Sequence, residues 1–118
     1  MKNSKIVIFI TAKTSKEAGK IAQYLLNNSL AGCCNIISGI KSYFFWDGKL
    51  AKTRESLLLV KSDASLLGKV IKLVKKYHSY KVPEIIALPI LAGDRQYLNW
   101  LTNNMRKLEK GKLCEKKF

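Results

Sequence analysis

Residues 33–61 read CCNIISGIKSYFFWDGKLAKTRESLLLVK, and this stretch decides the fold. Two runs rich in β-branched, aliphatic and aromatic residues, Cys33–Phe45 and Leu50–Lys61, flank the dipeptide Asp47–Gly48. An Asp-Gly pair between two such runs is a strong hairpin signal, because the favoured turn needs positive φ angles at both central residues. Gly39 interrupts the first run, and a glycine inside a strand commonly marks a bulge or a bend. We therefore expect a long β-hairpin that is bent in its first strand.

The chain before the hairpin predicts one strand and one helix. A β-branched run at Lys5–Thr11 is typical of a central strand. Apolar residues then recur three and four positions apart, which indicates an amphipathic helix capped near Ser15 and ending near Asn28.

The chain after the hairpin repeats this order. Ser62 and Asp63 are expected to cap a second amphipathic helix over 66–76, and two prolines bracket a fourth strand over 84–90. A last helix is expected from Gln96 to about Leu108. The order βαββαβ with a following helix is that of the ferredoxin-like α+β fold, in which two helices cover one face of a four-stranded antiparallel sheet.

Length and composition indicate one domain. The chain has 118 residues, of which 47% are hydrophobic and 25% charged. We expect a single domain over 1–108 and a lysine-rich tail over 109–118 that frays. No run approaches the roughly 18–20 apolar residues of a membrane span, and the apolar start Ile6–Ile10 is too short for a secretory signal. We therefore predict a cytosolic protein without a membrane partner.

The net charge of +14 raises the question of nucleic acid, since lysine and arginine neutralise phosphates. The lysines are spread over every expected element and are not interleaved with aromatic residues as in a base-stacking surface. Nucleic acid is therefore not the expected partner. The three cysteines are expected to be reduced, and their spacing predicts no zinc site.

Four consecutive aromatic residues precede the expected turn: Tyr43, Phe44, Phe45 and Trp46. Consecutive residues of a strand point to both sides, so each side of the hairpin carries aromatic surface. Such a patch usually marks an interface. We infer an oligomer in which the hairpin of one subunit extends onto the next.

The segment Tyr77–Pro89 is the expected polar site. It contains His78, the only histidine of the chain, and Glu84, an ionisable group at the start of an apolar strand. The histidine is expected to be either a hydrogen-bonded structural residue at a helix end or a metal ligand. Instead of binding a metal, Glu84 could pair with Lys61 or Arg54. The chain lacks a nucleophile–histidine arrangement, closely spaced carboxylates and a glycine-rich phosphate loop, so we predict that it is not an enzyme.

Several motifs together resemble the CutA family: LAGCCNIISGI at 30–40, Tyr43 with Trp46 and Gly48, and Val-Pro-Glu-Ile at 82–85. The resemblance runs from about Val7 to Leu101. It implies a ferredoxin-like subunit in a homotrimer similar in architecture to the PII signalling proteins. It also implies a role in tolerance of divalent cations, copper above all.

The resemblance further implies candidate ligand residues. Family members with proposed copper ligands use a cysteine where this chain has Ile10, two histidines where it has Tyr77 and His78, and a glutamate at Glu84. The remaining pair, His78 and Glu84, makes an incomplete copper(II) site, so we expect weak binding and no required cofactor. The alternative is a PII-like sensor that binds a small anion between subunits, with Lys61, Tyr80, Lys81 and Glu84 around it.

Overall fold

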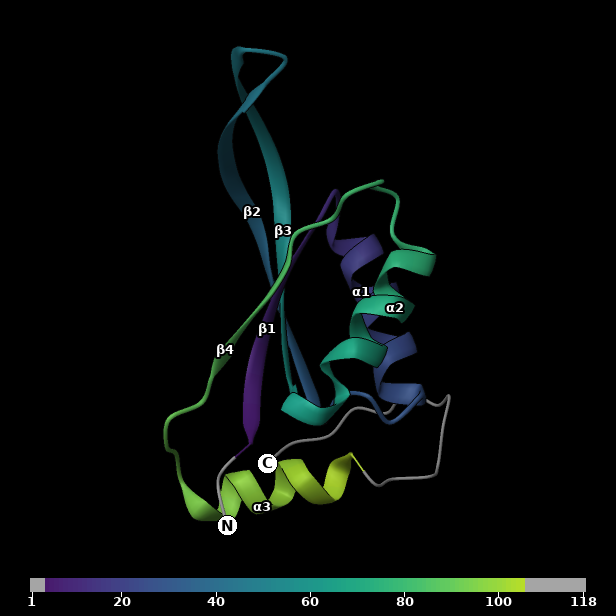
Figure 1. Ribbon diagram of the computed structural model, residues 1–118, viewed down its shortest axis with the longest axis vertical. Coiled ribbons are helices and arrows are strands. Elements are labelled where there is room, and N and C mark those ends of the chain that lie inside the picture. Colours follow the sequence, from purple (N-terminus) through teal and green to yellow (C-terminus); the bar gives the residue numbers. More distant parts are fainter. Residues whose placement is uncertain (1–3, 106–118) are drawn as a thin grey trace.

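Four antiparallel strands form one sheet in the order β2-β3-β1-β4, and two helices cover one of its faces (Figure 1). The structure is a computed structural model that describes residues 4–105. The strands are β1 (Lys5–Ala12), β2 (Cys33–Trp46), β3 (Lys49–Asp63) and β4 (Ile85–Pro89). The helices are α1 (Ser15–Asn27), α2 (Leu67–Tyr77) and α3 (Arg95–Asn104), with a short 3-10 turn η1 (Ala64–Leu66) before α2. The predicted ferredoxin-like α+β fold is confirmed.

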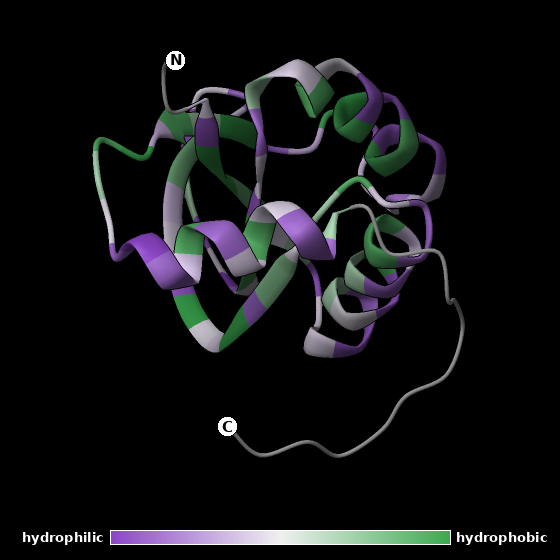
Figure 2. Ribbon diagram, turned by 90° about the horizontal axis from the view of Figure 1, so that it is seen from below, coloured by the Kyte–Doolittle hydropathy of each residue, from purple (hydrophilic) through white to green (hydrophobic). Residues whose placement is uncertain are grey.

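The core lies between the sheet and the helices α1 and α2. Alternate residues of β1, namely Ile6, Ile8 and Ile10, are buried on this side. Both helices carry alternating hydrophobic and hydrophilic segments, as expected of amphipathic helices that pack on a sheet (Figure 2).

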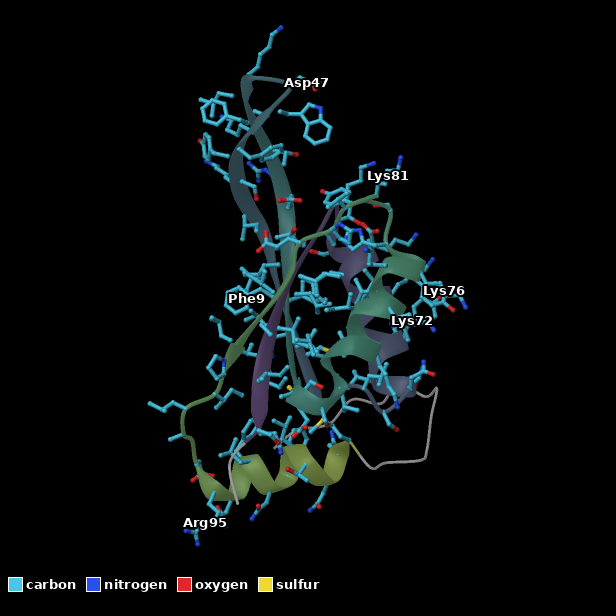
Figure 3. All side chains as sticks on the ribbon, in the orientation of Figure 1. Phe9, Asp47, Lys72, Lys76, Lys81 and Arg95 are labelled. Carbon is cyan, nitrogen blue, oxygen red and sulfur yellow. The ribbon has the colours of Figure 1, made fainter. Side chains whose placement is uncertain are left out.

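The opposite side of the sheet is apolar and is not covered by α1 or α2. We call it the open face, and Phe9 lies on it (Figure 3). By strand alternation and register its other apolar residues are Val7, Ile37, Leu57, Leu59, Ile86 and Leu88. Ile37, Ile86 and Leu88 are exposed in the single chain.

The predicted turn and bulge are both confirmed. Asp47 and Gly48 have φ angles of 51° and 75°, as a type I′ turn requires. Gly39 has φ 71° within the register shift between Ile37 and Ile40. Beyond this bulge the hairpin continues as a two-stranded arm over 40–55, which projects past α1 and α2 (Figure 1).

The cap of α1 differs from the predicted one. Thr14, not Ser15, is the N-cap, and its Oγ1 accepts from the Glu17 backbone N–H at 3.1 Å. Ser15 is the first helical residue, and its hydroxyl is hydrogen-bonded to the hydroxyls of Ser38 and Ser56. The Ser15 side chain is therefore engaged with the hairpin and is not available as a cap.

The predicted second cap is also wrong in part. The Asp63 carboxylate accepts from the Ser65 backbone N–H at 3.0 Å, so it caps the turn η1 and not α2. Ser62 is buried in β3 and donates to the Leu30 carbonyl. None of the described helices is long and apolar enough to cross a membrane.

Helix α3 lies across the end of the sheet (Figure 1). Leu101 is fully buried against Gly32, and the Asn104 side-chain amide donates to the Gly32 carbonyl at 2.8 Å. The helix ends at Asn104, before the predicted end near Leu108, which is outside the described residues. The predicted tail over 109–118 is also outside them, so the division at 108 stays a prediction.

Acid is expected to destabilise the fold partly through Asp63. Burial alone would raise the pKa of Asp63, but hydrogen bonds from Ser4, Ser65 and Lys5 outweigh it and hold the pKa well below its ordinary value. The unfolded carboxylate therefore binds a proton more readily than the folded one, and stability falls as the pH drops below the unfolded pKa. Urea unfolding from pH 6 to pH 2 should show a shallower decline in Asp63→Asn than in the wild type. Parallel curves would contradict this role.

Candidate functional site

His78 lies at the end of α2, and its buried ring is held by two hydrogen bonds. Nε2 is 2.7 Å from the Thr11 carbonyl oxygen, and Nδ1 is 3.0 Å from the Tyr80 backbone nitrogen. A carbonyl can only accept and a backbone N–H can only donate, so Nε2 carries the proton and Nδ1 accepts. These partners specify a neutral ring with both nitrogens engaged.

Glu17 of α1 holds the same loop through hydrogen bonds to Ser79. Its carboxylate accepts from the Ser79 backbone N–H at 2.7 Å, the Ser79 hydroxyl at 3.1 Å and the Lys13 backbone N–H at 3.2 Å. Burial would raise the pKa of Glu17, but these hydrogen bonds outweigh it and lower the pKa. Glu17 Oε2 is 3.7 Å from His78 Nδ1, which is no ion pair while the ring is neutral. Glu17 was not predicted as a site residue.

Tyr80 connects the loop to the middle of β3, opposite the bulge of β2. Its hydroxyl donates to Glu55 Oε2 at 2.7 Å, and Glu55 is buried. Burial, followed by the Glu55 carboxylate, raises the pKa of Tyr80 to about 12, so the phenol remains protonated at neutral pH. The sequence did not indicate Glu55 as the partner. Together these hydrogen bonds fix residues 78–80 in place, so the segment has a structural role and does not form an open pocket.

The predicted anion residues do not all meet within one chain. Lys61 pairs with Val7 and Cys33 across the sheet, and its amino group donates to the Asn35 side chain. Tyr80 is instead bonded to Glu55, six positions away along β3, or about 20 Å in an extended strand. Lys81 (Figure 3) is exposed in the loop between α2 and β4. Glu84 is exposed in the same loop. A site with all four residues would need more than one copy of the chain.

The predicted metal ligands His78 and Glu84 differ in accessibility. Glu84 is exposed, whereas His78 can bind a metal only after one of its hydrogen bonds breaks. Among residues 4–105, no group of three or more His, Cys, Asp or Glu side chains is placed to hold a metal ion. Ile10 is buried in the core, and Tyr77 stacks on Tyr24 with ring centroids 4.2 Å apart. Metal binding through His78 and Glu84 stays a prediction.

The cysteines in the described part of the chain are free thiols. Cys33 and Cys34 are half-buried neighbours in β2. Burial, followed by the neighbouring Cys33, raises the pKa of Cys34 to about 12, so this thiol stays protonated at neutral pH. Cys34 therefore behaves as a small apolar residue, as predicted.

The aromatic residues of the arm are exposed in the single chain. Phe45 and Trp46 are 75% and 69% exposed, and Tyr43 and Phe44 are also exposed. Exposed aromatic surface of this extent is typical of a binding interface. The predicted use of Tyr43, Phe44, Phe45 and Trp46 in a trimer interface stays a prediction.

Comparison with known proteins gives consistent matches over most of the chain. The sequence model of the family described as CutA1 divalent ion tolerance protein matches residues 6–104. A chloroplastic CutA 1 protein of Oryza sativa is 45% identical over 102 residues, which are 86% of this chain and 57% of the plant protein. The chain thus spans little more than half of that relative. The divalent-cation tolerance protein CutA of Thermus thermophilus is 43% identical over 98 residues, which are 83% of this chain and 95% of that protein.

A solved structure agrees with this result. The periplasmic divalent cation tolerance protein CutA of Archaeoglobus fulgidus superposes with a TM-score of 0.83 at 39% identity, covering 86% of this chain and 98% of the other. These relatives carry chloroplastic and periplasmic names, so the cytosolic location of this chain stays a prediction. The family match and the identities agree on one assignment: the chain belongs to the CutA1 family of divalent ion tolerance proteins.

Proposed function

We propose that this protein acts in divalent-cation tolerance as a non-catalytic homotrimer that binds copper(II) weakly. The observation that carries the proposal is the hydrogen bonding of His78, because both nitrogens of the best copper ligand in the chain are already engaged. The names of the relatives support the link to divalent cations. Among divalent first-row metals, copper(II) binds most strongly to imidazole and carboxylate ligands, so a titration with copper(II) is the most sensitive test of metal binding.

The two predicted ligands have different roles in this proposal. Glu84 is the only acidic residue between His78 and the start of β4, and it is exposed to an incoming cation. His78 supports the loop that carries Glu84, through its bonds to Thr11 and Tyr80. A single carboxylate per subunit gives weak and poorly selective binding.

Assembly is supported by two apolar surfaces that the single chain leaves uncovered. The open face carries exposed Ile37, Ile86 and Leu88, and the arm carries exposed Phe45 and Trp46. Burying both surfaces between copies would remove them from water, which is the main driving force for obligate association. A homotrimer, which the family resemblance implies, is our proposed arrangement.

Calorimetric titration with copper(II) tests the metal part of the proposal. We expect a dissociation constant weaker than about 10 µM for the wild type, with zinc(II) no tighter. Glu84→Gln should reduce the heats further, because it removes the exposed carboxylate. His78→Gln should leave them unchanged, because its side-chain amide can still donate to the Thr11 carbonyl.

The controls separate a ligand role of His78 from a structural one. Circular dichroism and thermal unfolding of each variant establish that the comparison is between folded proteins. Binding tighter than micromolar that saturates at a fixed ratio and is lost in His78→Gln would overturn the proposal. It would show that the ring leaves its two hydrogen bonds to coordinate copper.

A further inference from the structure

Three cationic side chains share one face of the arm. Lys41 lies directly opposite Arg54, and the next pair along this face is Tyr43 with Lys52. Because alternate residues of a strand share a face, Lys41, Lys52 and Arg54 project to the same side. The Lys52 amino group also lies 5.9 Å from the centre of the Tyr43 ring, which restrains it over the arm.

These side chains lie around an open hollow in the surface of the arm. Lys41, Lys52, Thr53 and Arg54 line it, and its volume is about 200 Å³. A water molecule occupies about 30 Å³ in the liquid, so the hollow has room for a small hydrated anion. Its four lining residues are exposed and can be reached from solvent.

Within the part of the chain that the structure describes, Lys41, Lys52 and Arg54 form no ion pair with an acidic side chain. The lysine–carboxylate ion pair found among residues 4–105 joins Lys5 to Asp63 and involves none of the three cations of the arm. Glu55 is next to Arg54, but it points to the other side of β3 and is bonded to Tyr80. Like charges directly opposite each other destabilise a strand pair. The pair Lys41 and Arg54 therefore destabilises the arm unless an anion lies between the two side chains.

The hollow lies on the face of the arm that also carries Tyr43 and Phe45. Lys52 and Arg54 are spaced by two from Ser56 and Leu58, whose side chains face the helices. The cations therefore project from the side of β3 opposite to the open face. Burial of the open face alone would leave this side of the arm uncovered, whereas burial of Tyr43 and Phe45 would bring a second copy next to the hollow.

We propose that this hollow is a binding site for a small free oxyanion of the phosphate class. The planar guanidinium of Arg54 can donate two parallel hydrogen bonds to phosphate oxygens, and the two lysines add compact positive charges. Three cations match a multiply charged phosphate better than a singly charged carboxylate. The site is separate from His78 and Glu84 and does not depend on the proposed metal binding.

Titration calorimetry at low ionic strength, with pyrophosphate and inorganic phosphate as the probes, tests this site. We expect the affinity for pyrophosphate to fall about tenfold for each cation removed, so that Lys41→Gln/Arg54→Gln binds about a hundredfold more weakly than the wild type. The matched control is Lys72→Gln/Lys76→Gln, which removes the same charge from the outer side of α2 (Figure 3). This control should bind within about twofold of the wild type.

A second measurement does not depend on the heats. Pyrophosphate should raise the thermal midpoint of the wild type and of the α2 control more than sodium chloride at equal ionic strength, but not that of the arm variant. Equal losses in the two double variants would overturn the proposal, because they would indicate attraction by net charge alone. Absence of binding by the wild type would overturn it as well.

Discussion

Gly32→Ala is expected to lower the free energy of unfolding by about 2–3 kcal/mol. A Cβ atom at Gly32 would be 2.7 Å from the Leu101 carbonyl oxygen and 2.7 Å from Leu101 Cδ1. Close carbon–oxygen contacts are ordinarily about 3.3 Å or longer. The Leu101 side chain could rotate, but its carbonyl belongs to α3, so the whole helix would have to shift. That shift would also strain the bond from Asn104 to Gly32.

Urea unfolding at a fixed protein concentration measures this effect. Gly68→Ala is the matched control, because its Cβ would meet no atom within 4 Å on the exposed side of α2. That substitution should stabilise the protein by about 0.5–1 kcal/mol, since alanine has the higher helix propensity. A Gly32→Ala protein as stable as the wild type would show that α3 is not docked closely on this glycine.

Leu88→Lys is expected to convert the proposed trimer to a monomer of 13.4 kDa. Leu88 lies on the open face beside Val7 and is 50% exposed in the single chain. In an assembly that buries this face, each copy would place an uncompensated ammonium in an apolar interface. Burying an unpaired charge costs several kcal/mol, and closed symmetry repeats the cost at every interface.

Sedimentation equilibrium or light scattering gives the mass directly. Leu91→Lys is the control, because it makes the same change at a residue outside the strands that is 94% exposed. It should leave the mass at three copies. An unchanged mass in Leu88→Lys would place the interface elsewhere, and a wild type that is already monomeric would refute the proposed trimer.

The fold was predictable because its strongest signals are local. The positive φ angles at Asp47 and Gly48, and the bulge at Gly39, follow from residues that tolerate those conformations. The choice of Thr14 over Ser15 as the cap was not predictable. It depends on Ser38 and Ser56, which engage the Ser15 hydroxyl from distant parts of the chain.

The candidate site was predictable only in its location. His78 was identified as the group to examine, but its partner Thr11 is 67 positions away in the sequence. Ser79 and Glu17 are 62 positions apart, and only the Thr-x-x-Glu capping pattern at 14–17 hinted at the glutamate. Lys61 was predicted to lie near Tyr80, but Tyr80 is bonded to Glu55, which is six positions from Lys61 along β3. Long-range pairing of this kind is decided by tertiary structure, which single-sequence patterns do not contain.

The central place of β1 has a consequence for synthesis of the chain. β1 is translated before the other strands of the sheet, yet its neighbours are β3 and β4. Ile10 therefore pairs with Leu58 and Ile85 only after these later residues have been synthesised. Contacts of such wide sequence separation slow folding, and an unpaired apolar strand can associate with other chains. The nascent protein would therefore be most vulnerable to aggregation while it emerges from the ribosome, until the residues of β4 have cleared the exit tunnel.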